Sequence, residues 1–147
     1  MGAEASAVNG LTTEFLAEHG VPVAEVLAAY EEAIAAGYII VAFNAQFDTK
    51  VMRAELRRAG RPDLFEQTPN ICVMRPLTDI LKLPSRRGPA WGYKWPNLAE
   101  ACAHFGIVNE NAHDAMGDAV AAMEILRALH ASGQLPEPAI HFAKERV

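Results

Sequence analysis

The sequence predicts an α/β protein in which helices alternate with a few apolar strands and form a layered sandwich with them. Residues 38–43 form a continuous apolar and β-branched run between Gly37 and Asn44, which is typical of a strand buried on both faces of a sheet. Residues 69–74 form a second short run of the same kind. Because helical patterns flank and separate these two runs, we expect a layered α/β arrangement.

Local start and stop signals place the helices around these strands. Thr12 or Thr13 can cap a short first helix that ends before Gly20, and Pro22 suits the start of a second helix that stops near Gly37. The apolar stripe expected on that second helix consists of Val23, Val26, Leu27, Tyr30 and Ile34. Further helices are expected over residues 48–59, 76–83, 96–105 and 114–132, followed by a loosely packed tail over residues 134–147.

Length and composition limit the class of protein. A chain of 147 residues with 51% hydrophobic and 21% charged residues fits one globular domain. The sequence has neither an apolar run of about 20 residues nor a basic-then-apolar signal pattern, so we expect a cytoplasmic protein without a membrane span. Cys72 and Cys102 lie in apolar segments, which favours reduced thiols in the core.

Charge is distributed unevenly along the chain. Residues 1–49 contain seven acids and no Lys or Arg, whereas residues 50–94 contain ten bases and four acids. Four of these bases, Arg53, Arg57, Arg58 and Arg61, cluster at helical spacing. They form either a surface that faces phosphates or a solvated helix face, and charge alone does not decide between the two.

The long segment of residues 84–95 mixes three bases with three aromatic residues. This composition suits a loop that stacks on nucleic-acid bases and contacts phosphates. A surface loop whose aromatic side chains fold back as anchors has the same composition. The sequence leaves both interpretations open.

One carboxylate stands out because of its position on the last helix. Asp118 shares a helix face with Ala122, Ile125 and Leu129, so its charge requires a cation or hydrogen-bond donors. Asp114, by contrast, is suited to cap the start of that helix. His113 lies just before the helix, where an imidazole beside a metal-bound water can act as a general base.

A second carboxylate, Asp48, has a comparable position after the first strand. It shares a helix face with Val51, Met52 and Leu56, and it can either cap its helix or turn toward the same site as Asp118. Sites of α/β folds form at the ends of such elements. The sequence therefore indicates a candidate site built from two acids and a histidine.

The residues around these acids resemble a known family. Asn44-x-x-Phe47-Asp48 resembles the second motif of the DnaQ-like (DEDDh) 3′–5′ exonucleases, the family of the DNA polymerase III proofreading subunits. His113-x-Ala115-x-x-Asp118 resembles their third motif. The resemblance covers about residues 4–132, with Asn9 at a position where His is expected in the family. It implies the ribonuclease H-like α/β fold.

The resemblance also implies a mechanism and a set of roles. In the family, four acids hold two divalent ions, Mg²⁺ or Mn²⁺, at the scissile phosphate. Asp118 would bind the metal on the nucleophile side, Asp48 would serve the second metal, and His113 would take the proton from the attacking water. Asn44 and Phe47 would shape the site. The implied partner is a 3′ end of single-stranded DNA or RNA, with a DNA polymerase as a further candidate.

The sequence departs from the family at its first motif. No Asp in the chain has a Glu two residues later, so the family's Asp-x-Glu pair is absent. We therefore expect residues 1–147 to form a single, N-terminally incomplete exonuclease domain that lacks the first strands of the sheet and has weak or no activity. The alternative is a non-catalytic ribonuclease H-like module that binds nucleic acid or assists another protein. A metal phosphohydrolase with His113-Asp114 as ligands is disfavoured by the strand at residues 38–43.

Overall fold

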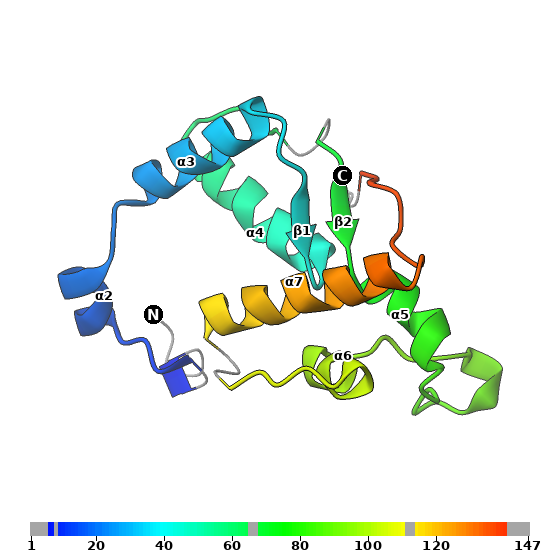
Figure 1. The fold of residues 1–147 in the computed structure, drawn as a ribbon. Coiled ribbons are helices and arrows are strands. Elements are labelled where there is room, and N and C mark those ends of the chain that lie inside the picture. Colours follow the sequence, from blue (N-terminus) through cyan, green and yellow to red (C-terminus); the bar gives the residue numbers. More distant parts are fainter. Residues whose placement is uncertain (1–5, 8, 65–67, 111–113, 141–147) are drawn as a thin grey trace.

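The computed structural model describes residues 6–7, 9–64, 68–110 and 114–140, and Figure 1 shows their arrangement. In chain order the elements are α2 (Thr13–His19), α3 (Val23–Ala35), β1 (Ile40–Ala42), α4 (Ala45–Arg58), β2 (Asn70–Cys72), α5 (Met74–Leu81), the 3₁₀ helix η1 (Pro89–Trp91), α6 (Leu98–Phe105) and α7 (Ala115–Ala131). The helices expected from the sequence all occur, with ends that differ by up to three residues. None of the helices in the described residues is long and apolar enough to cross a membrane.

The two strands pair in parallel. Ile40 pairs with Asn70 and Ala42 with Cys72, and α4 forms the crossover between the strands. Two further backbone bonds, from Val73 N–H to Ala42 O (3.1 Å) and from Met74 N–H to Phe43 O (3.0 Å), continue the pairing. The described residues thus form a mixed α/β fold with a two-stranded parallel sheet.

The expectation that the first strand is buried on both faces is wrong. β1 is only three residues long, and Tyr38, Ile39 and Val41 are exposed. β2, by contrast, is buried at all three positions, because it lies between β1 and the backbone of Ala139. Among the described residues β1 has a neighbour on one side only, so the apolar run in the sequence forms an edge strand.

Ala139 belongs to the segment that was expected to be loosely packed. Its backbone exchanges two hydrogen bonds with Asn70, of 2.8 and 3.0 Å, and Leu135 packs against the main core. Within residues 134–140, Leu135 and Ala139 therefore contact the fold, whereas Gln134, Glu137 and Ile140 are exposed. Residues 141–147 lie outside the described part of the chain.

The main core lies where α5, α6 and α7 pack against β2. Leu77, Ile125 and Leu129 are completely buried there, and Cys102 is almost so. A smaller core joins α3 to α4. Of the stripe expected on α3 only Leu27 is buried; Val23 and Val26 are about half exposed. Cys72 and Cys102 are free, buried thiols, as expected.

Side-chain caps explain why three helices begin where they do. The Thr12 side chain accepts a hydrogen bond from Phe15 N–H at the start of α2. At the start of α6, Asn97 and Glu100 form a capping box in which each side chain accepts from the other's backbone N–H. Asp114 caps α7 by accepting from Gly117 N–H (3.1 Å). These caps hold α6 and α7 in a defined position beside the sheet.

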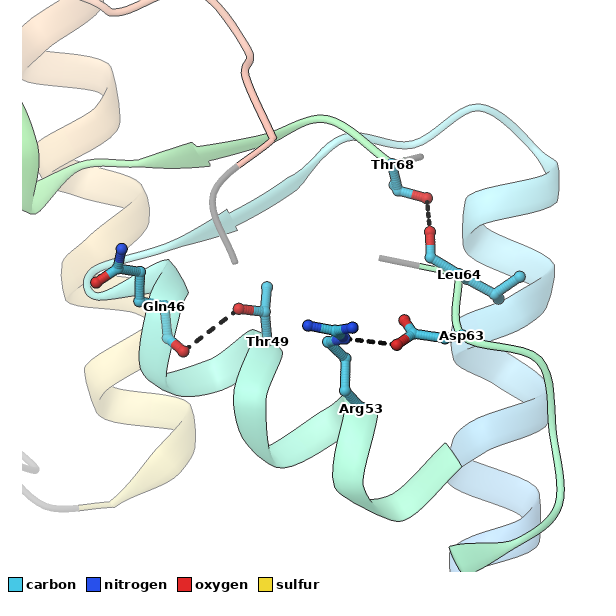
Figure 2. A network of polar contacts seen from close by, with 6 residues as sticks. All are labelled: Gln46, Thr49, Arg53, Asp63, Leu64 and Thr68. Carbon is cyan, nitrogen blue, oxygen red and sulfur yellow. Dashed lines mark hydrogen bonds and ion pairs between the residues drawn. The ribbon is translucent and has the colours of Figure 1, made fainter. Parts of the chain in front are cut away.

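The arginines in and after α4 pair with acids, which decides a question that the sequence left open. Arg53 is 8% exposed, and its Nε lies 2.5 Å from Oδ2 of Asp63 in the polar network of Figure 2. Arg58 pairs with Glu55, and Arg61 pairs with Glu31. Arg53 and Arg61 thus join α4 and the connection after it to neighbouring segments, whereas Arg58 is exposed and pairs within α4; all three charges are paired with acids.

Candidate active site

A cavity of about 580 Å³ lies at the carboxyl end of β1, where α4 and α7 begin. Figure 1 shows α7 crossing the carboxyl ends of the two strands, which is the edge at which α/β folds bind ligands. The residues that line the cavity are Asn9, Leu11, Val41, Ala42, Phe43, Asn44, Phe47, Asp48, Leu98, Asp114, Ala115, Asp118, Ala119 and Ala122. Four of the five site residues expected from the sequence are among them: Asn44, Phe47, Asp48 and Asp118.

Asp48 reaches the cavity from the first turn of α4. It is the fourth residue of the helix, and Asn44 occupies the N-cap position, so Asp48 is not the cap. The residue is exposed, yet burial of its carboxyl group raises its pKa above the ordinary value, an effect that a backbone hydrogen bond partly opposes. This carboxylate is thus less well solvated than a surface aspartate.

Asp118 reaches the same cavity from the first turn of α7. Its helix face continues through Ala122, Ile125 and Leu129, all of them buried, as the spacing predicts. The partner that this half-buried carboxylate needs is Asn109, whose Nδ2 donates a hydrogen bond of 2.9 Å to Oδ1. The charge of Asp118 also adds to the effect of burial in raising the pKa of the Cys102 thiol.

Asn109 is a site residue that the sequence did not indicate. It lies in the connection between α6 and α7, nine residues before Asp118, and neither helical nor strand periodicity relates the two positions. The only available signal is an amide side chain in a short loop that precedes the helix carrying the acid. The sequence alone therefore does not single out Asn109 as a partner of Asp118; the conformation of the loop does.

The structure describes most of the other residues considered for the site. Asp114 lines the cavity while it caps α7, and Phe47 presents an aromatic side chain that is 64% exposed. Asn9 and Leu11 complete the wall, so the position at which the family is expected to carry His does lie at this cavity. His113, the expected general base, lies outside the described residues.

The donor set at the cavity fits a divalent metal ion only in part. Asp48 and Asp118 supply carboxylate oxygens, the ligands that Mg²⁺ and Mn²⁺ prefer. Within the described ranges, however, no group of three or more His, Cys, Asp or Glu side chains is placed to hold a metal ion. Asp114 and Asp118 also each accept a hydrogen bond already. These residues therefore do not make a complete two-metal site.

Comparison with known families agrees with the arrangement of the cavity. A family model described as Exonuclease, RNase_T, matches residues 1–126. Exonuclease domains of this family hydrolyse nucleic acids, generally use divalent metal ions and have a ribonuclease H-like α/β fold. The matched range includes all the residues that line the cavity.

A relative supports the same assignment. The chain is 29% identical to a protein of Escherichia phage 186 named Uncharacterized exonuclease CP81, over 89% of this chain and 68% of the phage protein. No solved structure matches significantly. Because the family model covers most of its length, the chain belongs to the RNase_T exonuclease family, the DnaQ-like family that its two sequence motifs resemble.

Proposed function

We propose that this protein is a 3′–5′ exonuclease that removes nucleotides from the 3′ end of single-stranded DNA or RNA. The observation that carries the proposal is the cavity itself, which brings Asn44, Phe47 and Asp48 of one motif together with Asp118 of the other. These motifs are far apart in the sequence and reach the cavity from two different helices. Binding alone would not require two acids at one cavity.

The two acids have the chemistry expected of metal ligands. Asp118 and Asp48 would hold Mg²⁺ or Mn²⁺, and such an ion stabilises negative charge at a phosphate. The family's other two carboxylates, from its Asp-x-Glu motif, have no counterpart in this sequence. We therefore expect the chain by itself to bind the metal weakly and to hydrolyse slowly.

The side chains around the acids have positioning roles. The bond from Asn109 fixes one oxygen of Asp118, so that the other oxygen keeps a defined direction. Phe47 offers an exposed ring at the cavity on which a terminal base can stack. In the sequence, His113 directly precedes Asp114, which lines the cavity. His113 would accept the proton of the attacking water, a role that suits an imidazole, whose ordinary pKa is near 6.5.

Hydrolysis of a labelled single strand by a high concentration of the chain, with Mn²⁺ or with EDTA, tests the proposal. We expect slow hydrolysis that EDTA abolishes and that Asp118→Asn, Asp48→Asn and His113→Ala each reduce by about 100-fold or more. Asp79→Asn removes an exposed carboxylate that does not line the cavity, so this control should leave the rate unchanged.

Two other outcomes would change the proposal. Rapid turnover by the isolated chain would contradict the expectation that the absent pair limits activity. A chain that neither hydrolyses the strand nor binds Mn²⁺ at Asp118 would support the alternative, a non-catalytic module that binds nucleic acid or assists another protein. The incomplete donor set of the described residues is the observation that favours this alternative.

A further inference from the structure

The loop between α5 and α6 presents a set of stacked side chains that the cavity does not use. The arginine–tryptophan surface consists of Arg87, Trp91, Tyr93 and Trp95 in the loop, together with Arg75 in the first turn of α5. The Arg87 guanidinium lies 5.4 Å from the centre of the Trp91 ring, and that of Arg75 lies 5.9 Å from the Trp95 ring. Exposed fractions of 65% for Trp91 and 52% for Trp95 leave much of each indole accessible.

The loop has a defined conformation that holds these rings outward. Pro84 and Tyr93 form an antiparallel bridge, closed by hydrogen bonds from Lys94 N–H to Leu83 O (2.9 Å) and from Ser85 N–H to Gly92 O (3.3 Å). Gly92 has a positive φ of 68°, which a bulkier residue rarely adopts. In Figure 1 this segment projects at the right, beyond α5 and α6. The aromatic residues are thus not anchors folded into the core.

The positive charge of the surface has no acidic partner within the described part of the chain. Among the residues that the structure describes, no carboxylate forms an ion pair with Arg75 or Arg87, and the buried Nε of Arg75 has no hydrogen-bond acceptor. Lys94, on the same loop, does pair with Glu100. Residues 75–100 carry five bases and two acids in a chain whose net charge is −5. The excess of positive charge is therefore local.

We propose that the arginine–tryptophan surface binds single-stranded nucleic acid. An arginine stacked on one face of an indole leaves the other face for a base, and the same guanidinium reaches the neighbouring phosphate. Trp91 and Trp95 are four residues apart, so at most about 14 Å separates their Cα atoms, which matches roughly two to four nucleotides. Stacking of this kind tolerates any base sequence.

The surface goes beyond the proposed hydrolysis, because its binding requires neither a metal ion nor the acids of the cavity. Its position suits a strand that continues from the cavity, since Leu98 lines the cavity only three residues after Trp95. This last relation rests on the proposed function. The binding itself does not.

Intrinsic fluorescence gives a direct test, because Trp91 and Trp95 are the two tryptophans of the chain. The probe is an oligothymidylate of about 12 nucleotides, added in EDTA so that it stays intact. We expect saturable quenching of the fluorescence. With a dye-labelled probe, anisotropy should show about tenfold weaker binding for Trp91→Leu and for Trp95→Leu. Arg87→Gln should lower the slope of log affinity against log salt by about 0.7.

Arg58→Gln is the matched control, because it removes an exposed arginine that pairs with Glu55 outside the surface. It should bind as the unmodified chain does. Because the probe is added in EDTA, the signal does not depend on hydrolysis, so a failure of hydrolysis does not count against the surface. Circular dichroism melting identifies any variant that fails to fold; if Trp95→Leu does so, Trp91→Leu and Arg87→Gln decide.

Two results would overturn the proposal. The first is the absence of quenching and of binding, which would indicate that the exposed rings serve a protein partner. The second is binding that Trp91→Leu, Trp95→Leu and Arg87→Gln leave unchanged, since the strand would then lie elsewhere on the protein.

Discussion

Two arginine-rich regions of this protein use the same side chain for different purposes. In and after α4, Arg53, Arg58 and Arg61 each pair with an acid, and Arg53 is buried. At the loop between α5 and α6, the guanidinium groups of Arg87 in the loop and of Arg75 in α5 lie over tryptophan rings and have no acidic partner among the described residues. The first region stabilises the fold, and the second leaves its charge available to a ligand.

A cluster of basic residues in a sequence therefore does not indicate a binding surface until it is known whether their side chains pair with acids. Arg53 pairs with Asp63, in the connection after α4, and Arg61 pairs with Glu31 on α3. An arginine that is buried and paired with an acid contributes to the packing of the protein and is not available to a ligand. Substitutions in the two regions should therefore separate stability from binding.

The largest expected effect is that of Arg53→Ala on stability. The substitution removes the buried guanidinium that pairs with Asp63, so we expect a loss of about 2 kcal/mol in the free energy of unfolding. This loss is smaller than that for a fully buried ion pair, because the Asp63 side chain is partly exposed. Urea denaturation measures the change. Oligonucleotide binding should persist under native conditions. A variant that loses binding and keeps its stability would contradict the separation.

The helix next to the loop should show an intermediate effect. Asn97→Ala removes one half of the capping box at the start of α6, which we expect to cost about 1 kcal/mol of stability. Asn97→Asp retains a capping oxygen and should cost much less, which makes it the control. Equal losses in the two variants would show that the cap contributes little.

Exposed arginines should have small effects on stability in both regions. Arg58→Gln and Arg87→Gln should each change the free energy of unfolding by less than about 0.5 kcal/mol, because exposed charges contribute little. Only Arg87→Gln should weaken oligonucleotide binding. Equal weakening by the two substitutions would mean that general charge, and not stacking, attracts the strand.

The smallest effect is expected at Asp48, and it depends on pH. Burial raises the pKa of Asp48 in the folded protein, so ionisation opposes folding: the penalty is absent below the ordinary aspartate pKa and fully present above the raised one. Asp48→Asn should therefore raise the melting temperature at neutral pH. Near pH 3, where the carboxyl group is protonated, the substitution should not raise the melting temperature. A lower melting temperature at neutral pH would show that the carboxylate stabilises the fold.

Local signals in the sequence predicted the parts of the structure that depend on neighbouring residues. The cap at Asp114 and the face shared by Asp118, Ile125 and Leu129 follow from helical spacing, and the structure confirms both. The shared cavity of Asp48 and Asp118 agrees with the resemblance to the family motifs. The assignment of site roles remains a prediction.

Other features depend on contacts that spacing does not encode. Asn109 reaches Asp118 from a loop, so no periodicity indicated it. The exposure of Val41 and the edge position of β1 among the described residues were not predictable, because an apolar run looks alike in an edge strand and in a central one. The pairing of Ala139 with Asn70 is likewise a long-range contact.

The polarity of hydrolysis tests the central claim most directly. A single strand labelled at its 5′ end is incubated with a high concentration of the chain and Mn²⁺, and the products are resolved to single nucleotides. The proposed 3′–5′ exonuclease predicts a ladder of labelled products that shortens slowly by one nucleotide at a time, and no ladder with Asp118→Asn. Release of the labelled 5′ nucleotide as the first product, or an unchanged ladder with Asp118→Asn, would contradict it.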